Sequence, residues 1–94
     1  MFYYTYILKS KKDGEFYTGC TKDLKLRFEE HKKGEVESTK DRRPLELIYY
    51  EACKNNIDAR HREMYLKRYY GKLFVKNRLK SFLSERPQSN KKPI

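Results

Sequence analysis

The chain of 94 residues lacks several features that would assign it at once to a common class. It has no tryptophan, two cysteines, three prolines and four glycines, and no apolar run near the roughly 20 residues that span a bilayer. Cys20 and Cys53 lie far apart without CxxC spacing, which excludes a disulfide-rich scaffold and argues against structural zinc. An export signal is also absent, so we expect a cytoplasmic, single-domain protein without a membrane segment.

Acidic residues are scarce relative to basic ones, and the charge is therefore strongly unbalanced. Lys and Arg number 23 against 13 Asp and Glu, which gives a net charge of +10. Such an excess on a short chain indicates a polyanionic partner. Without an apolar run, nucleic acid is a better candidate than an acidic membrane surface. A basic surface with no partner is the alternative.

The order of the predicted elements defines a fold class. Residues 2–8 alternate and carry apolar or aromatic groups on both faces, which suits a strand covered on both sides. A turn and a second strand at 15–19 make a hairpin, and Asp23 caps a helix that ends near residue 33. A polar loop follows at 35–43 and a third strand at 45–51. Two helices come next, one at 56–70 that Gly71 stops and one at 72–83.

This order, ββαβαα, predicts an α+β domain in which a small, mainly antiparallel three-stranded sheet is flanked by helices. We expect the folded domain to cover residues 1–84 and residues 85–94 to form a disordered basic tail, because the last segment has no periodicity.

Polar side chains recur on helix faces that the pattern turns inward. Arg27 and His31 lie one turn apart on such a face of the first predicted helix. Glu63 lies on the apolar stripe of the second, and it is the only acid between residues 60 and 80, a stretch with eight basic residues. A buried carboxylate is costly unless it is paired, protonated or bound to a cation.

Each candidate also has an ordinary structural explanation. Glu63 could pair with Arg27 or another basic residue, His31 could be a satisfied boundary histidine, and Tyr6 and Tyr17 could be core aromatics. Together, however, they supply what phosphodiester cleavage requires: a base for water, a cation for the pentacovalent charge and a metal ligand.

These residues stand in an order that resembles the GIY-YIG endonuclease domain, in particular its small stand-alone bacterial members and the N-terminal domain of excinuclease C. TYI at 5–7 stands where the family has GIY, and YTG at 17–19 stands where it has YIG. TKDLKLRFEEH at 21–31 is similar to the helix with the catalytic arginine. DARHREMYLK at 58–67 is similar to the segment with the metal-binding glutamate. The resemblance spans about residues 2–82.

The resemblance implies roles for individual residues. Glu63 would be the metal ligand, and the catalytic residues would be Tyr6, Tyr17, Arg27, His31 and, by a looser match, Asn77. The chain departs from the family pattern at Thr5 and Thr18, which replace a glycine and an isoleucine. It departs again at Cys20, where some relatives have a lysine near the reacting water.

The resemblance also implies a single divalent cation, Mg²⁺ or Mn²⁺, and DNA as substrate, whether branched, single-stranded or duplex. Cleavage would be structure-selective or weakly sequence-specific, in DNA repair or recombination, with room for a protein partner that targets it. Basic residues would contact the phosphate backbone: Lys22, Arg60, Lys67, Arg68, Lys72 and Lys76. Whether Tyr6, Tyr17 or His31 is the base stays open, and a non-catalytic nucleic-acid-binding module on the same fold is the alternative.

Overall fold

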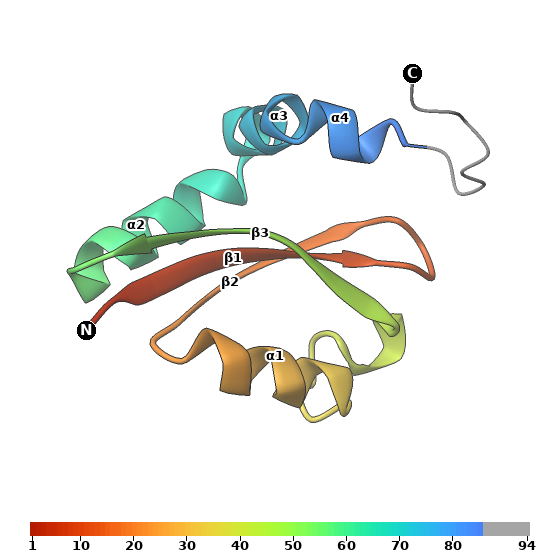
Figure 1. The fold of residues 1–94 in the computed structure, drawn as a ribbon, viewed down its shortest axis with the longest axis horizontal. Helices are drawn as coiled ribbons and strands as arrows, with labels where there is room; N and C mark the ends of the chain where they lie inside the picture. The colour runs from red at the N-terminus through yellow and green to blue at the C-terminus, as the bar shows by residue number, and fades with distance from the viewer. Residues whose placement is uncertain (86–94) are drawn as a thin grey trace, which may run out of the picture.

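The computed structural model describes residues 1–85, in which a three-stranded antiparallel sheet separates two helical layers (Figure 1). The strands lie side by side in the order β2–β1–β3. The predicted α+β fold is therefore confirmed. The elements are β1 (Tyr3–Ser10), β2 (Phe16–Thr21), α1 (Leu24–Lys32), the 3₁₀ turn η1 (Lys40–Arg42), β3 (Leu45–Cys53), α2 (Asn56–Leu66), α3 (Tyr69–Arg78) and α4 (Lys80–Leu83).

The central strand β1 supplies side chains to two separate cores, one on each face of the sheet. Tyr6 and Leu8 pack on the side covered by α1, whereas Ile7 packs with Leu66 of α2 and Val75 of α3 on the other side. Figure 1 shows α1 on one face and α2, α3 and α4 on the opposite face. The prediction of a strand covered on both sides is confirmed, since Tyr6, Ile7 and Leu8 are each at most 1% exposed.

Turn and capping residues position the helices as the sequence predicts. Gly14 adopts a positive φ of 75° in the hairpin turn, a conformation that L side chains rarely take. Asp23 caps α1, its carboxylate accepting a hydrogen bond from the Leu26 amide at 3.0 Å. Asn55 caps α2 in the same way. The short connection from β2 into α1 holds α1 against the sheet.

The end of the second helix differs from its prediction. α2 ends at Leu66 rather than near residue 70, and Gly71 lies inside α3 instead of stopping a helix. A Cβ at Gly71 would collide with the Tyr65 carbonyl oxygen and the Leu66 Cα. The glycine is therefore needed for the close approach of α3 to the end of α2, and its role is packing rather than termination.

The remaining predictions also need adjustment. The helix predicted at 72–83 is divided into α3 and α4, with Leu79 between them. The polar segment at 35–43 is not simply an exposed loop, because it contains η1 and buries Val36 and Thr39. The tail expected at 85–94 lies outside the described residues from residue 86 onward.

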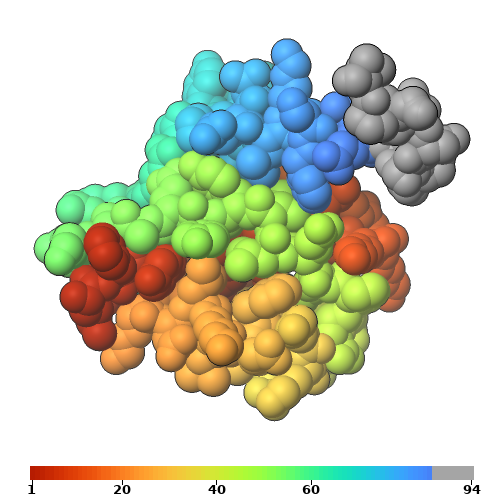
Figure 2. Space-filling model, viewed as in Figure 1, coloured from red at the N-terminus to blue at the C-terminus, as the bar shows by residue number. Residues whose placement is uncertain are grey.

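The surface view in Figure 2 places β3 across the front, between α1 and the helices α3 and α4. Because the strand order is β2–β1–β3, strand β2 is the opposite edge of the sheet, and the candidate site described below lies there. Within residues 1–85 the helices are too short or too polar to cross a membrane.

Candidate active site

Tyr6 lies across strand β2 because its neighbour there is a glycine. Tyr6 and Gly19 are directly opposite each other in the β1–β2 ladder. A Cβ at Gly19 would collide with the Oη and Cζ atoms of Tyr6, so a side chain at this position would displace the ring. Glycine normally weakens a strand. Here it makes room for the Tyr6 hydroxyl, which explains the glycine of the YTG tripeptide.

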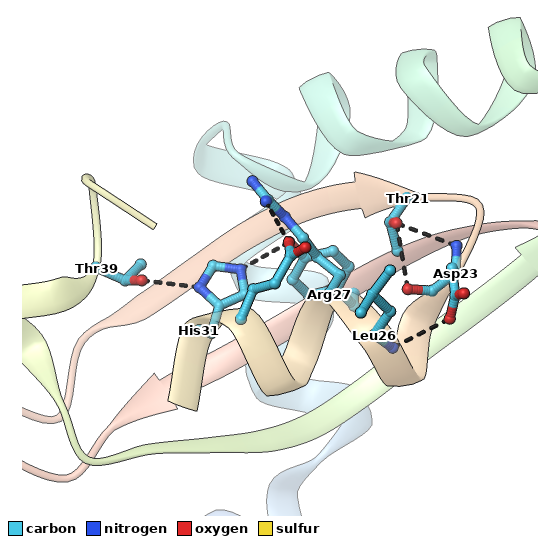
Figure 3. A network of polar contacts seen from close by, with 8 residues as sticks. Thr21, Asp23, Leu26, Arg27, His31 and Thr39 are labelled. Carbon is cyan, nitrogen blue, oxygen red and sulfur yellow. Dashed lines mark hydrogen bonds and ion pairs between the residues drawn. The ribbon is translucent and has the colours of Figure 1, made fainter. Parts of the chain in front are cut away.

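The Tyr6 hydroxyl begins a buried chain of polar groups that ends at Thr39. Tyr6 Oη lies 2.9 Å from His31 Nε2, and His31 Nδ1 lies 2.8 Å from Thr39 Oγ1. Both His31 and Thr39 are fully buried. Figure 3 shows the His31 ring extending from α1 toward Thr39, which lies on a different segment of the chain. Both ring nitrogens of His31 are thus satisfied, and the ring is held in one orientation.

Burial keeps both groups of this pair neutral near pH 7. It raises the pKa of Tyr6 to about 12, against a smaller opposing effect of the Arg27 guanidinium. Burial, together with a smaller effect of the positive charge of Arg27, lowers the pKa of His31 to about 4. A neutral imidazole has one donor and one acceptor nitrogen. His31 can therefore accept a proton at one nitrogen while the other stays hydrogen-bonded.

Tyr17 completes a cluster of three rings with Tyr6 and His31. The centroid of the Tyr17 ring lies 5.2 Å from that of His31 and 6.4 Å from that of Tyr6. Tyr17 is partly exposed, whereas Tyr6 is closed off from solvent. The two phenols named from the sequence are thus together, and Tyr17 is the one that solvent can reach.

Arg27 lies one helical turn before His31 and remains half-exposed. Its Nη1 lies 2.8 Å from Glu30 Oε1, and the side chain is 38% exposed. The Glu30 carboxylate raises the pKa of Arg27, with a smaller contribution from the nearby Tyr6 hydroxyl. Figure 3 shows the guanidinium reaching from α1 toward the sheet. The sequence allowed Glu63 to pair with Arg27 or with another basic residue. In the structure Glu63 pairs with Lys67, and the ion pair with Arg27 does not form. The guanidinium is available beside the rings.

Glu63 approaches the same strand from the opposite helical layer. It lies on α2, its side chain is 19% exposed, and its Oε2 lies 3.1 Å from Lys67 Nζ. Burial raises the pKa of the Cys20 thiol on β2, and the negative charge of Glu63 raises it as well, by a smaller amount. It also contributes, as the weakest of several causes, to the raised pKa of Tyr6. The candidate residues therefore meet at β2 from both sides of the sheet.

The donor set around Glu63 limits the kind of metal that it could hold. Within the described residues, no three His, Cys, Asp or Glu side chains form a group that could enclose a cation. Mg²⁺ is commonly bound through one or two carboxylates and completes its octahedral shell with water and substrate phosphate. A single carboxylate among lysines fits a cation that arrives with a phosphate, and it does not fit an all-protein cage.

Five of the six basic residues predicted to contact nucleic acid follow β2 from one end to the other. Shallow hollows along this strand bring Lys22 and Arg60 beside Cys20, Lys67 and Lys72 beside Thr18, and Lys72 and Lys76 beside Phe16. We call Lys22, Arg60, Lys67, Lys72 and Lys76 the β2 row. A larger hollow, about 540 Å³, lies elsewhere, between α1 and the strands near Tyr4 and Tyr50.

Two predicted site residues are not brought to β2. Asn77 is exposed on α3, two residues beyond the buried Val75 and on the opposite side of the helix, so it faces away from the sheet. Arg68 is the N-cap residue of α3, just beyond the end of α2, where it lines a separate hollow with His61 and Met64. The structure therefore brings Tyr6, Tyr17, Arg27 and His31 together, with Glu63 near enough for its charge to act on Tyr6 and Cys20, and it leaves Asn77 and Arg68 apart.

Thr39 and Glu30 belong to the site but were not predicted. Glu30 is three residues after Arg27, a spacing at which helical side chains meet, so this pair could have been found. Thr39 is in a segment whose polarity indicates exposure, and no periodic signal connects it to His31. Only the folded chain shows that contact.

The fold and this cluster together define a small α+β domain that gathers two phenols, an imidazole and a guanidinium, with one carboxylate nearby. The sequence model of the GIY-YIG catalytic domain matches residues 2–80, and the chain belongs to that family, which is one of nucleases. Curated relatives in Staphylococcus aureus strains Mu3 and Mu50 are UPF0213 proteins, each 40% identical over 68 residues, covering 71% of this chain and 82% of the relative.

A solved structure agrees with the fold. The solution NMR structure of the UPF0213 protein BH0048 from Bacillus halodurans is 33% identical in sequence and has a TM-score of 0.50. The comparison covers 93% of this chain and 89% of that one. The names of these relatives state no activity. The expected family is thus confirmed, while the reaction of this chain has to be argued from its site.

Proposed function

We propose that this protein is a metal-dependent endonuclease that hydrolyses DNA phosphodiester bonds, structure-selectively or with weak sequence preference, in DNA repair or recombination. One observation carries the proposal. Residues from β1, β2, α1 and α2, as far apart in the sequence as Tyr6 and Glu63, lie beside one strand and a row of cations. Membership of a nuclease family supports the same conclusion.

The reaction needs a proton acceptor for the attacking water, and the ring cluster offers a path. Tyr17 is the partly exposed phenol, and Tyr6 contacts His31 Nε2. A phenol is a weak proton acceptor near neutral pH unless it is first ionised. His31 is neutral and can accept a hydrogen bond from the Tyr6 hydroxyl at Nε2 when Nδ1 donates to Thr39. We assign acceptance of the water proton to Tyr17, the phenol that solvent reaches, whose ionisation a neighbouring positive charge would favour, and we assign Tyr6 and His31 to holding the ring cluster in place.

Arg27 would stabilise the charge that develops on the phosphorane. Its planar fork can contact two phosphate oxygens, and it is half-exposed beside the rings rather than buried. Glu30 holds one nitrogen of the fork and leaves the others available. Glu63 would hold the divalent cation and give up its contact with Lys67, which would then bind phosphate in the β2 row. When bound, the cation would neutralise charge on the scissile phosphate and the leaving oxygen.

The proposal is tested by changing the carboxylate and the guanidinium separately. Glu63→Gln and Arg27→Ala should each lower the cleavage rate by a factor of about 100 or more, because each removes charge stabilisation of the transition state. The rates are measured with Mg²⁺ or Mn²⁺ on a panel of branched, nicked, single-stranded and duplex DNA. EDTA should abolish the activity of the unaltered protein.

Glu29→Gln is the matched control, because it removes the same charge from a partly exposed residue of α1 that pairs with Lys32. It should leave the cleavage rate unchanged. Binding that depends steeply on salt, without turnover of any substrate at any metal concentration, would assign the chain to a non-catalytic binding module instead.

A further inference from the structure

The outer side of α2 and the start of α3 expose a group of large side chains that the two cores do not use. The exposed fractions are 53% for Met64, 43% for Tyr65, 68% for Tyr69 and 70% for Tyr70. Met64 and Tyr65 line a shallow hollow with His61 and Arg68. We call Met64, Tyr65, Arg68, Tyr69 and Tyr70 the outer aromatic face.

These side chains are not required for packing of the helices. α2 is anchored by Ala59 and Leu66, and α3 by Gly71 and Val75, all of which are buried. Tyr69 and Tyr70 instead contact each other, with ring centroids 5.1 Å apart in an edge-to-face arrangement. Tyr65 contacts the Arg62 guanidinium, which lies 5.3 Å from the ring centroid. Large apolar side chains exposed in such numbers on neighbouring helices often mark a binding site.

The charge around this face defines what could cover it. Glu63 is the only acid from residue 59 to residue 84, it is paired with Lys67, and it faces β2. The same stretch contains eight basic residues: Arg60, Arg62, Lys67, Arg68, Lys72, Lys76, Arg78 and Lys80. A second copy of this chain would bring eight further positive charges against the first. The suitable occupant is a polyanion that also carries flat apolar groups.

Unpaired nucleotides have both properties, because their bases are free to stack while their phosphates meet cations. A duplex offers the phosphates alone, since its bases are already stacked inside. We propose that the outer aromatic face binds single-stranded DNA by stacking bases on Tyr65, Tyr69 and Tyr70, with Arg68 holding the adjacent phosphate. This inference rests on the proposed function for the nature of the substrate, and it narrows that substrate to DNA with an unpaired segment.

The test separates base stacking from phosphate contact. Fluorescence anisotropy is measured in EDTA with the full chain carrying Glu63→Gln, so cleavage cannot interfere. The two probes are an oligo-dT strand and a strand of equal length built from abasic residues, which has the same phosphates and no bases. Oligo-dT should bind about tenfold more tightly for each stacked base, whereas the abasic strand should report the electrostatic contribution alone.

Tyr69→Ala combined with Tyr70→Ala should remove most of the preference for oligo-dT and leave abasic binding unchanged. Tyr50→Ala is the matched control, because Tyr50 is also 52% exposed but packs against Tyr4 on the other face of the sheet. It should keep the full preference. Tyr69→Phe should keep it as well, since stacking needs the ring and not the hydroxyl.

Equal binding of the two probes by the chain with intact tyrosines would overturn the inference, and this result does not depend on how the variants fold. A dimer in sedimentation equilibrium that the double substitution dissociates would assign the face to a second copy instead. Because all binding is measured without a metal, absence of nuclease activity would contradict the proposed function and leave this result unaffected.

Discussion

Thr39 shows how far residue-scale reasoning extends in this chain. The spacing of Arg27 and His31 predicts that both lie on one helix face, and they do. The partner of His31 on its far side is eight residues further on, in a segment rich in charge, and is nevertheless fully buried. Gly19 is a similar case, because a glycine is needed there to make room for the Tyr6 ring on the neighbouring strand. Local sequence patterns identify candidate side chains, whereas contacts between distant segments of the chain explain why those side chains are needed.

His31 should make the stability of the fold sensitive to mild acid. Its folded-state pKa of about 4 lies below the ordinary 6.5, so the unfolded chain binds the proton first as the pH falls. Stability is then complete above pH 6.5 and declines toward pH 4, by up to about 3 kcal/mol. Urea unfolding followed by circular dichroism at several pH values measures this decline.

The window from pH 6.5 to pH 5 is the most informative, because ordinary carboxylates titrate below it. His31→Gln should flatten the dependence there, whereas His61→Gln, which changes an exposed histidine on α2, should leave it as it is. An unchanged slope after His31→Gln would show that another group causes the acid sensitivity.

At the scale of secondary-structure elements, the hydrophobic pattern predicts which faces of a strand are covered better than it predicts where a helix ends. The two-sided pattern of β1 identified it correctly as a strand covered on both faces. Residues 59–70 continue a helical pattern without interruption, yet α2 ends at Leu66. The break is caused by α3 packing back over the end of α2, which requires Gly71. Nothing in the local pattern distinguishes that glycine from a helix terminator.

Gly71→Ala tests this explanation, because two effects oppose each other. Helix propensity alone predicts that alanine inside α3 stabilises the fold by about 1 kcal/mol. The added Cβ would meet backbone atoms of Tyr65 and Leu66, which cannot move as a flexible side chain does, and such overpacking costs about 1–3 kcal/mol or more. We expect net destabilisation in urea titrations. Lys72→Ala, at an exposed neighbouring position, should change stability little, and a more stable Gly71→Ala variant would contradict the close approach.

At the scale of the whole molecule, the candidate site exists only because both helical layers reach β2. Tyr6, Tyr17, Arg27 and His31 lie on the α1 side, and Glu63 approaches from the α2 side. The family resemblance identifies these residues, but it also suggested Asn77, which α3 turns away from the sheet. The sequence motif does not show on which side of the sheet each residue lies. That position decides whether the residue belongs to the site.

The β2 row predicts how binding to duplex DNA depends on salt. Lys72 and Lys76 lie on α3 beside Phe16 of β2. If each neutralises one phosphate, Lys72→Gln and Lys76→Gln should each lower the slope of log affinity against log salt by about 0.9. Because phosphate contacts carry no sequence information, affinity should fall equally for every duplex sequence. Anisotropy titrations at several salt concentrations, without a divalent metal, measure both quantities.

The decisive comparison is with Lys33→Gln, which removes one charge from the exposed C-cap of α1, outside the row. Each of the three variants lowers the net charge of +10 by the same amount. If the overall field of the protein held the duplex, all three would weaken binding alike. Since phosphates contact particular side chains at short range, only the two α3 variants should reduce the slope. An equal effect of Lys33→Gln would mean that the duplex does not follow β2. The β2 row could then no longer be assigned to contacts with the phosphate backbone.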